Sequence, residues 1–187
     1  MPDYASSLTV FGIPRRHYHC HLHNFDFSDH TYLQRAVDVF LEQEANAPHL
    51  LLTGPPVVCK THISVGLYRT MVSRHGTGTC LWLAVPDFIY RLKARMDEPS
   101  REDPFLQVTE ARDFVALDDL FGRELTPYEL NNIIYPLIQI AHSNHAPLVI
   151  TTNYDLEQVA EVMTPHELDR IMDSCEVITF KGESRRP

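Results

Sequence analysis

One stretch in the first third of the chain limits the possible folds more than any other. A short apolar run over residues 50–53 ends at Gly54, and a Lys60-Thr61 pair begins six residues after that glycine. This spacing fits the phosphate-binding loop G-x-x-x-x-G-K-[ST] at every fixed position except one, where Cys59 replaces glycine. The apolar run predicts a buried strand and the residues after the loop predict a helix. In that setting backbone N–H groups and a helix N-terminus converge on phosphate oxygens, so we expect a phosphate site here.

The rest of the sequence alternates short apolar runs with longer helical patterns. We expect strands at 50–53, 79–85, 114–117, 147–152 and 177–180, and helices at 31–45, 60–73, 86–96 and 127–142. Pro136 should kink or split the last of these helices, because proline lacks the N–H that a helix interior needs. Strands that are apolar on both faces, alternating with helices, predict an α/β fold. The expected architecture is a three-layer sandwich around a parallel five-stranded sheet.

Composition excludes disordered, collagen-like and fibrous proteins, because 44% of the residues are apolar and 22% are charged. With 187 residues, the chain is predicted to be a single folded domain over 1–187. Its formal net charge of −9 argues against a generic nucleic-acid coat. The four cysteines lie far apart without a C-x-x-C pair, which favours a reducing compartment. No signal-peptide pattern and no apolar run of about 20 residues occurs, so we expect a cytoplasmic protein without a membrane partner.

Polar residues follow two of the other expected strands. Asp118 and Asp119 come directly after the third apolar run, and Asn153 follows the fourth. Ligands of parallel sheets bind beyond the carboxyl ends of the strands, where acidic groups can hold Mg²⁺ and polarise an attacking water. The simpler alternatives are a helix N-cap for the aspartates and a turn residue for the asparagine.

Further motifs occur in a fixed order around the loop. They are Gly12-Ile13-Pro14-Arg15-Arg16 and Leu22-His23-Asn24-Phe25-Asp26 before it, and Ala116-Leu117-Asp118-Asp119-Leu120, Ile150-Thr151-Thr152-Asn153, Leu168-Asp169-Arg170-Ile171 and Gly182-Glu183-Ser184-Arg185-Arg186 after it. Together they resemble the DnaC/IstB-like family of helicase loaders and transposition helpers, a branch of the AAA+ ATPases. In this resemblance the loop is the Walker A motif, 116–120 is Walker B and 150–153 is sensor I.

The resemblance implies a P-loop NTPase fold of the AAA+ type, with residues 1–26 as an N-terminal segment and 27–187 as the core. It implies that ATP or ADP binds with Mg²⁺. Thr61 and Asp118 would hold the metal, Asp119 would orient or activate water, and Asn153 would sense the γ-phosphate. The nucleotide-binding residues would be Gly54, Pro55, Pro56, Val57, Val58, Cys59, Lys60, Thr61, His62 and Arg186.

The same resemblance implies partners. Arg170 would act on the nucleotide of a neighbouring subunit, which requires a homo-oligomer. ATP state would then be coupled to the assembly or remodelling of a helicase, a transposase or another DNA-bound partner, with single-stranded DNA as a further ligand.

Two other functions stay open at this point. The chain could be a degenerate, non-hydrolysing scaffold or nucleotide sensor that binds a protein partner, since Cys59 places a side chain where the family keeps glycine. A small-molecule kinase with a P-loop is a third alternative, although nothing in the sequence resembles an acceptor site.

Three further features have competing interpretations. His17, His19, His21 and His23 alternate, which would place them on one face of a strand as zinc ligands, or else in a solvated or nucleotide-adjacent segment. Arg91, Lys93 and Arg95 follow the second strand and could contact single-stranded DNA, by resemblance, or form a solvated helix surface. Trp82 lies in an apolar run and is predicted to be core rather than a platform for base stacking.

Overall fold

The computed structural model describes residues 13–56, 59–97, 108–173 and 175–180. Its centre is a sheet of five parallel strands in the order β2-β3-β4-β1-β5. The strands are β1 (His49–Thr53), β2 (Cys80–Ala84), β3 (Phe114–Leu120), β4 (Leu148–Thr152) and β5 (Cys175–Thr179). The predicted parallel sheet is therefore confirmed, with bounds that differ by a few residues.

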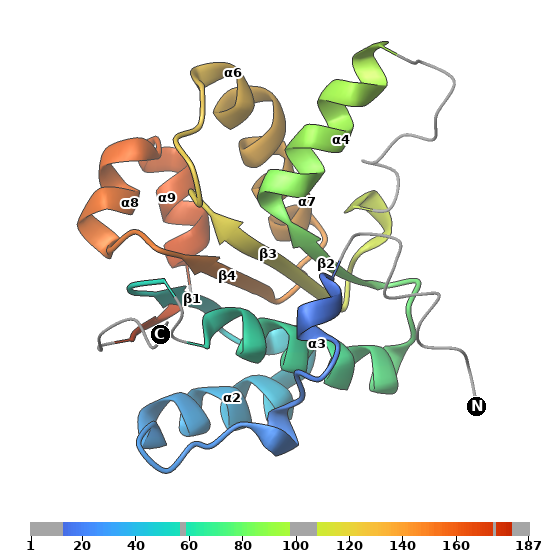
Figure 1. The fold of residues 1–187 in the computed structure, drawn as a ribbon, viewed down its shortest axis with the longest axis vertical. Coiled ribbons are helices and arrows are strands. Elements are labelled where there is room, and N and C mark those ends of the chain that lie inside the picture. The colour runs from blue at the N-terminus through green and yellow to red at the C-terminus, as the bar shows by residue number, and fades with distance from the viewer. Residues whose placement is uncertain (1–12, 57–58, 98–107, 174, 181–187) are drawn as a thin grey trace.

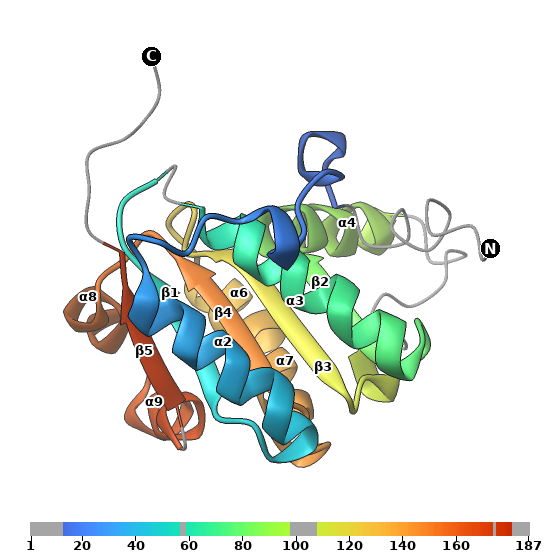
Figure 2. The same ribbon diagram turned by 90° about the horizontal axis from the view of Figure 1, so that it is seen from below.

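Helices cover both faces of the sheet, as the three-layer prediction requires (Figure 1). One face carries α2 (Thr31–Gln43) and α3 (Lys60–His75), which lie in front of the sheet in Figure 2. The other face carries α4 (Val85–Asp97), α6 (Pro127–Glu129), α7 (Tyr135–Ser143), α8 (Leu156–Val162) and α9 (Pro165–Met172).

Side-chain alternation along the strands separates two cores. In β1, Leu50 and Leu52 pack with α2 and α3, whereas Leu51 packs with the helices on the opposite face. All three leucines are at most 1% exposed. Because both faces of the strand are buried, its sequence is a continuous apolar run rather than an alternating one.

Two predicted elements differ from the structure in informative ways. β3 does not stop before the aspartates: it continues to Leu120, with a register irregularity between Leu117 and Leu120. The predicted helix over 127–142 is interrupted, as expected from Pro136, by a π-helical turn, Leu130–Ile134, between α6 and α7. Helices α8 and α9 were not predicted.

The described part of the N-terminal segment packs on α3. It forms two short 3₁₀ turns, η1 (Arg15–His17) and η2 (Leu22–Asn24), so the strand expected from the alternating histidines is wrong. Gly66 of α3 makes room for η2, since a Cβ there would come within 2.9 Å of the Leu22 side chain. Nearby, the Arg69 guanidinium donates to the Tyr18 carbonyl at 2.7 Å.

No helix in the described part of the chain is both long enough and apolar enough to cross a membrane.

Candidate functional site

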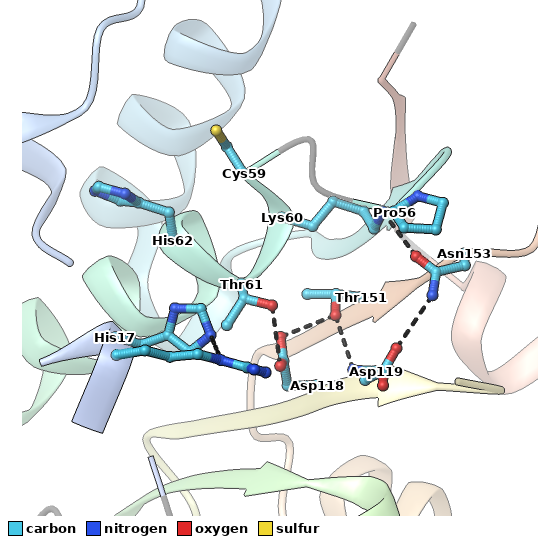
Figure 3. A pocket seen from close by; sticks show the side chains of 11 residues that line it. His17, Pro56, Cys59, Lys60, Thr61, His62, Asp118, Asp119, Thr151 and Asn153 are labelled. Carbon is cyan, nitrogen blue, oxygen red and sulfur yellow. Dashed lines mark hydrogen bonds between the residues drawn. The ribbon is translucent and has the colours of Figure 1, made fainter. Parts of the chain in front are cut away.

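A cavity of about 470 Å³ lies at the carboxyl ends of the strands (Figure 3). Its lining comes from the loop after β1, the start of α3, the ends of β3 and β4, and η1. The lining residues are Arg16, His17, Pro56, Cys59, Lys60, Thr61, His62, Asp118, Asp119, Thr151 and Asn153. Residues that are up to about 135 positions apart in the sequence therefore meet at one edge of the sheet.

Lys60 is the first residue of α3, is buried, and donates hydrogen bonds to three oxygen atoms. Its Nζ donates to the carbonyl of Gly54 at 2.7 Å, to the carbonyl of Pro55 at 2.8 Å and to Asn153 Oδ1 at 3.1 Å. Burial lowers the pKa of the ammonium group, against the opposing effect of Asp119 and Asp118. All three of its N–H donors have acceptors here, so a phosphate would have to replace one or more of these oxygens.

Gly54 is required at the end of β1 for steric reasons. Its φ is +127°, and a Cβ would overlap the carbonyl oxygen of Phe180, just beyond β5. The Phe180 amide donates to the Thr53 carbonyl at 2.8 Å, which holds the two strand ends together. The first glycine of the loop motif therefore allows close approach of backbone, a role that only glycine fills without strain.

Asp118 is a buried carboxylate surrounded by hydroxyl donors. Thr61 Oγ1 donates to its Oδ2 at 3.1 Å, and its Oδ1 accepts from Ser64 at 3.1 Å and Thr151 at 2.9 Å. Burial raises the pKa of Asp118 to about 6, although the three hydroxyls oppose that rise and Asp119 adds to it. Carboxylate and hydroxyl oxygens are donors that Mg²⁺ prefers, so the Asp118–Thr61 pair fits a magnesium ion.

Contacts of both the backbone and the side chain fix the position of Asp119. Its φ of +59° is unusual for a residue with a Cβ, and its amide donates to Thr151 Oγ1 at 2.9 Å. A Cβ on Gly122 would overlap the Asp119 carboxylate. Asn153 Nδ2 donates to Asp119 Oδ1 at 3.3 Å, so Asn153 bridges Asp119 and Lys60.

Cys59 is exposed and precedes the first residue of α3 with φ +60° and ψ +5°. This left-handed conformation costs a residue with a Cβ about 1–2 kcal/mol, whereas glycine adopts it freely. The structure thus gives a physical reason for glycine at this position of the loop motif.

Replacing Cys59 with glycine is expected to stabilise the protein by about 1 kcal/mol and to tighten ATP binding, because it relieves the backbone and removes a side chain beside the phosphates. Thermal unfolding and nucleotide titration measure the two effects. Cys59→Ala is the matched control, since it removes the thiol but keeps the Cβ and should show neither gain in full. Bound nucleotide should also slow alkylation of Cys59. Equal ATP affinities for wild type and Cys59→Gly would show that the loop does not hold phosphate in this way.

The described structure lends no support to the nucleotide contacts predicted for four residues, Val57, Val58, His62 and Arg186. Val57, Val58 and Arg186 fall outside the described residues. His62 lines the cavity, but its Nε2 faces two acceptors, the His21 carbonyl and Asn24 Oδ1, both at 3.0 Å. It therefore donates to the N-terminal segment and anchors that segment on α3.

Arg170 of α9 does not line the cavity of its own chain. Its Nη1 donates to Glu167 Oε1 at 2.9 Å, and the Arg170 side chain is 21% exposed. The buried Glu167 leaves its other oxygen, Oε2, without a hydrogen-bond partner in the described structure.

Sequence reasoning did not assign Arg16, Ser64 and Thr151 to this region, and it placed His17 beside the nucleotide only as one alternative for the histidine cluster. Thr151 lies within the motif over residues 150–153. Ser64 lies one helical turn after Lys60, so helical spacing could have identified Ser64. Arg16 and His17 reach the cavity through packing on α3, which no local pattern encodes.

The histidine cluster and the basic helix have local partners. The His17 and His19 rings lie 3.8 Å and 4.0 Å from Cys20 Sγ, but no group of three potential metal ligands is found in the described residues. Arg91 pairs with Asp87 at 3.2 Å, and Lys93 pairs with Glu129 at 2.7 Å.

Glu129 and Trp82 are both buried. The Glu129 carboxylate also accepts from Arg123, which is the main reason its pKa lies well below the usual range. Trp82 is 2% exposed and donates from Nε1 to Ser64 Oγ at 3.1 Å, so the prediction that it is a core residue is confirmed.

The chain is similar to known proteins in sequence and in fold. Residues 12–187 match the family described as IstB-like ATP binding protein. A protein of insertion sequence IS5376 from Geobacillus stearothermophilus is 26% identical over 153 residues, which make up 79% of this chain and 57% of that protein. The chain therefore spans a little more than half the length of this relative.

Solved structures share the fold. The DnaC helicase loader is 24% identical with a TM-score of 0.74, over 90% of this chain and 100% of the solved one. DnaI is 21% identical with a TM-score of 0.76, over 94% and 95%. AMPPCP-bound DnaA from Aquifex aeolicus is 12% identical with a TM-score of 0.71, over 87% and 50%. The predicted P-loop NTPase fold of the AAA+ type is thereby confirmed.

Proposed function

Because the chain belongs to the family of IstB-like ATP-binding proteins, we propose that it binds ATP with Mg²⁺ in this cavity, hydrolyses it between subunits, and uses the nucleotide state to assemble or remodel a DNA-bound protein partner. The observation that carries the proposal is the convergence of Lys60, Thr61, Asp118, Asp119 and Asn153 on one cavity at the N-terminus of α3. Three separate strand ends supply these residues.

Each side chain has a role that its chemistry suits. The Lys60 ammonium would exchange its loop carbonyls for the β- and γ-phosphates, and Thr61 and Asp118 would hold Mg²⁺. The metal would neutralise phosphate charge when bound. Asp119 would orient the attacking water, and the Asn153 amide, which already contacts both Lys60 and Asp119, would sense the γ-phosphate.

The class of partner is inferred from similar proteins and not from the cavity. One solved relative is a helicase loader, and one similar protein comes from an insertion sequence. A replicative helicase or a transposase on DNA is the partner class that fits both. Single-stranded DNA contact at α4 would compete with the existing pairing of Arg91 and Lys93 with carboxylates of the same chain.

A scaffold that binds nucleotide without hydrolysis is the second candidate. It is favoured by one observation, the exposed Cys59 side chain in a left-handed conformation next to the phosphate site. Phosphate release from ATP, compared with an Asp119→Asn variant, separates the two candidates.

Nucleotide binding is tested by thermal unfolding. Mg²⁺-ATP or Mg²⁺-ADP at about a hundred times Kd should stabilise the wild-type protein by about 2.7 kcal/mol, a rise in Tm of roughly 5–10 °C. Lys60→Ala should abolish the rise, because it removes the buried ammonium. Arg35→Ala, which removes an exposed cation on α2, should leave it intact. No rise for the wild type at millimolar nucleotide would contradict nucleotide binding at this site.

A further inference from the structure

The N-terminal segment contributes two residues to the lining of the cavity. Arg16 and His17 lie in η1 and line the cavity together with Thr61 and Asp118. In Figure 3 the His17 ring lies on the same side as Thr61 and Asp118, whereas Pro56 and Asn153 lie on the other. The cavity is thus bounded by the N-terminal segment as well as by the loop and the strand ends.

The segment that carries Arg16 is firmly attached to α3. His62, Gly66 and Arg69 contact it at successive turns of one helix face. On either side of η1, Ile13 and Cys20 are 3% and 2% exposed and belong to the core. Arg16 is therefore presented to the cavity from a fixed position, which limits the entropy lost when it binds a ligand.

The Arg16 guanidinium retains most of its donors. Its Nε donates to His17 Nε2 at 3.0 Å, and no carboxylate among the described residues forms an ion pair with it. Burial, followed by the Arg16 charge, lowers the pKa of His17, which favours the neutral ring that accepts this bond. The remaining N–H groups form the planar fork that suits phosphate oxygens.

The charges that line the cavity indicate what the Arg16 guanidinium would contribute to nucleotide binding. Among the described residues, Arg16 and Lys60 are the cations that line the cavity and Asp118 and Asp119 are the anions, so this part of the lining is neutral in sum. A nucleotide triphosphate carries more negative charge than one Mg²⁺ neutralises, and Lys60 alone cannot offset both aspartates and the excess. A second cation in the same chain would reduce this excess. Arg16 lines the cavity and can supply it, in addition to Arg186, which the resemblance assigns to the nucleotide and which lies outside the described residues.

We propose that Arg16 is a phosphate ligand for the nucleotide bound by the same chain, held toward the cavity by its bond to His17. This inference rests on the proposed function, because it concerns the same cavity. Its consequence is that the N-terminal segment contacts the nucleotide directly, so that nucleotide binding changes the contacts of this segment.

The experiment compares Arg16→Ala with Arg15→Ala. Both residues are exposed and adjacent in η1, but Arg15 does not line the cavity, which makes it a matched control. Titration with Mg²⁺-ATP and Mg²⁺-ADP should show affinity weakened about tenfold to hundredfold by Arg16→Ala, the loss expected for a charged hydrogen bond. Arg15→Ala should stay within about twofold of wild type. Affinity for ATP should also fall less steeply with salt in Arg16→Ala, since one fewer cation meets phosphate.

Adenosine, which lacks phosphate, provides the second comparison. Arg16→Ala should leave its affinity unchanged, and Arg16→Gln serves as a second variant if the alanine variant unfolds. Equal ATP affinities for Arg16→Ala and Arg15→Ala, or an equal loss for adenosine and ATP, would overturn the inference. Either result would leave the proposed function intact if wild type binds ATP and Lys60→Ala does not. Absence of ATP binding by wild type would instead contradict the proposed function itself.

Discussion

Replacing Asp118 with asparagine should raise the free energy of unfolding of the nucleotide-free protein at pH 8, by up to about 3 kcal/mol. Burial raises the pKa of this carboxyl to about 6, from an ordinary value of 3.8. A tenfold change in acidity corresponds to about 1.4 kcal/mol, so ionising Asp118 in the folded state costs an energy of this order. Asparagine fills the same space without the charge, and the hydroxyls of Thr61, Ser64 and Thr151 can rotate to pair with its amide.

The pH dependence has a definite sign. Well below pH 3.8 the carboxyl of Asp118 is protonated in both the folded and the unfolded chain. The free energy of unfolding is then not reduced by ionisation of this group. As the pH rises from about 4 to about 6, the unfolded chain loses this proton first, and the folded state loses stability relative to it. The advantage of Asp118→Asn over wild type should therefore grow through this window and remain constant above it.

Chemical unfolding of both proteins at pH 5 and pH 8, in the presence of a chelator, measures this difference. Asp38→Asn is the control, because Asp38 is exposed on α2 and its variant should follow wild type at both pH values. The same Asp118→Asn substitution should abolish Mg²⁺-dependent tightening of nucleotide binding. A variant less stable than wild type at pH 8 would show that the hydrogen bonds to the carboxylate outweigh its burial. The expected result would show that the ionised Asp118 carboxylate, which would hold Mg²⁺, lowers the stability of the nucleotide-free protein.

Much of the candidate site could be predicted because of one topological fact. The carboxyl ends of parallel strands meet at one edge of the sheet, so residues that follow Leu52, Leu117 and Thr152 must lie near each other. That argument needs only strand positions, which the apolar runs reveal. The conformation of Asp119 could not be obtained in this way. Its positive φ follows from the bulged end of β3, which depends on pairing with β4.

The N-terminal segment shows where a local pattern misleads. Alternating histidines have the period of a strand, yet Pro14 fixes the backbone at the start of η1. The segment's apolar side chains, including Ile13, Cys20 and Leu22, pack in the core that α3 also joins. Helices α8 and α9, in contrast, carry readable signals. Asp155 with Gln158 forms a capping box, and Thr164 caps the first turn of a helix that begins with proline. The sequence therefore carries local signals for the start of both helices.

Arg170→Ala is expected to lower ATP turnover about a thousandfold, the effect of removing an arginine finger that stabilises transition-state charge. ATP affinity should change little, because Arg170 does not line the cavity of its own chain and instead binds Glu167. Phosphate release and nucleotide titration on the same preparations separate the two quantities. Arg74→Ala is the matched control, since Arg74 also binds a glutamate, Glu44, at 3.0 Å, and its loss should leave turnover near that of wild type.

Mixing variants tests whether Arg170 acts on a neighbouring subunit. Neither Arg170→Ala nor Asp119→Asn protein should be active alone, but an interface can combine the intact Asp119 of one subunit with the intact Arg170 of the next. In an equal and random mixture about a quarter of head-to-tail interfaces have this combination, so activity should recover to about a quarter of wild type. A mixture as inactive as its components, while wild type turns over ATP, would mean that Arg170 does not supply the finger in trans. Its bond to Glu167 would then be structural, and another arginine would have to serve the neighbouring site.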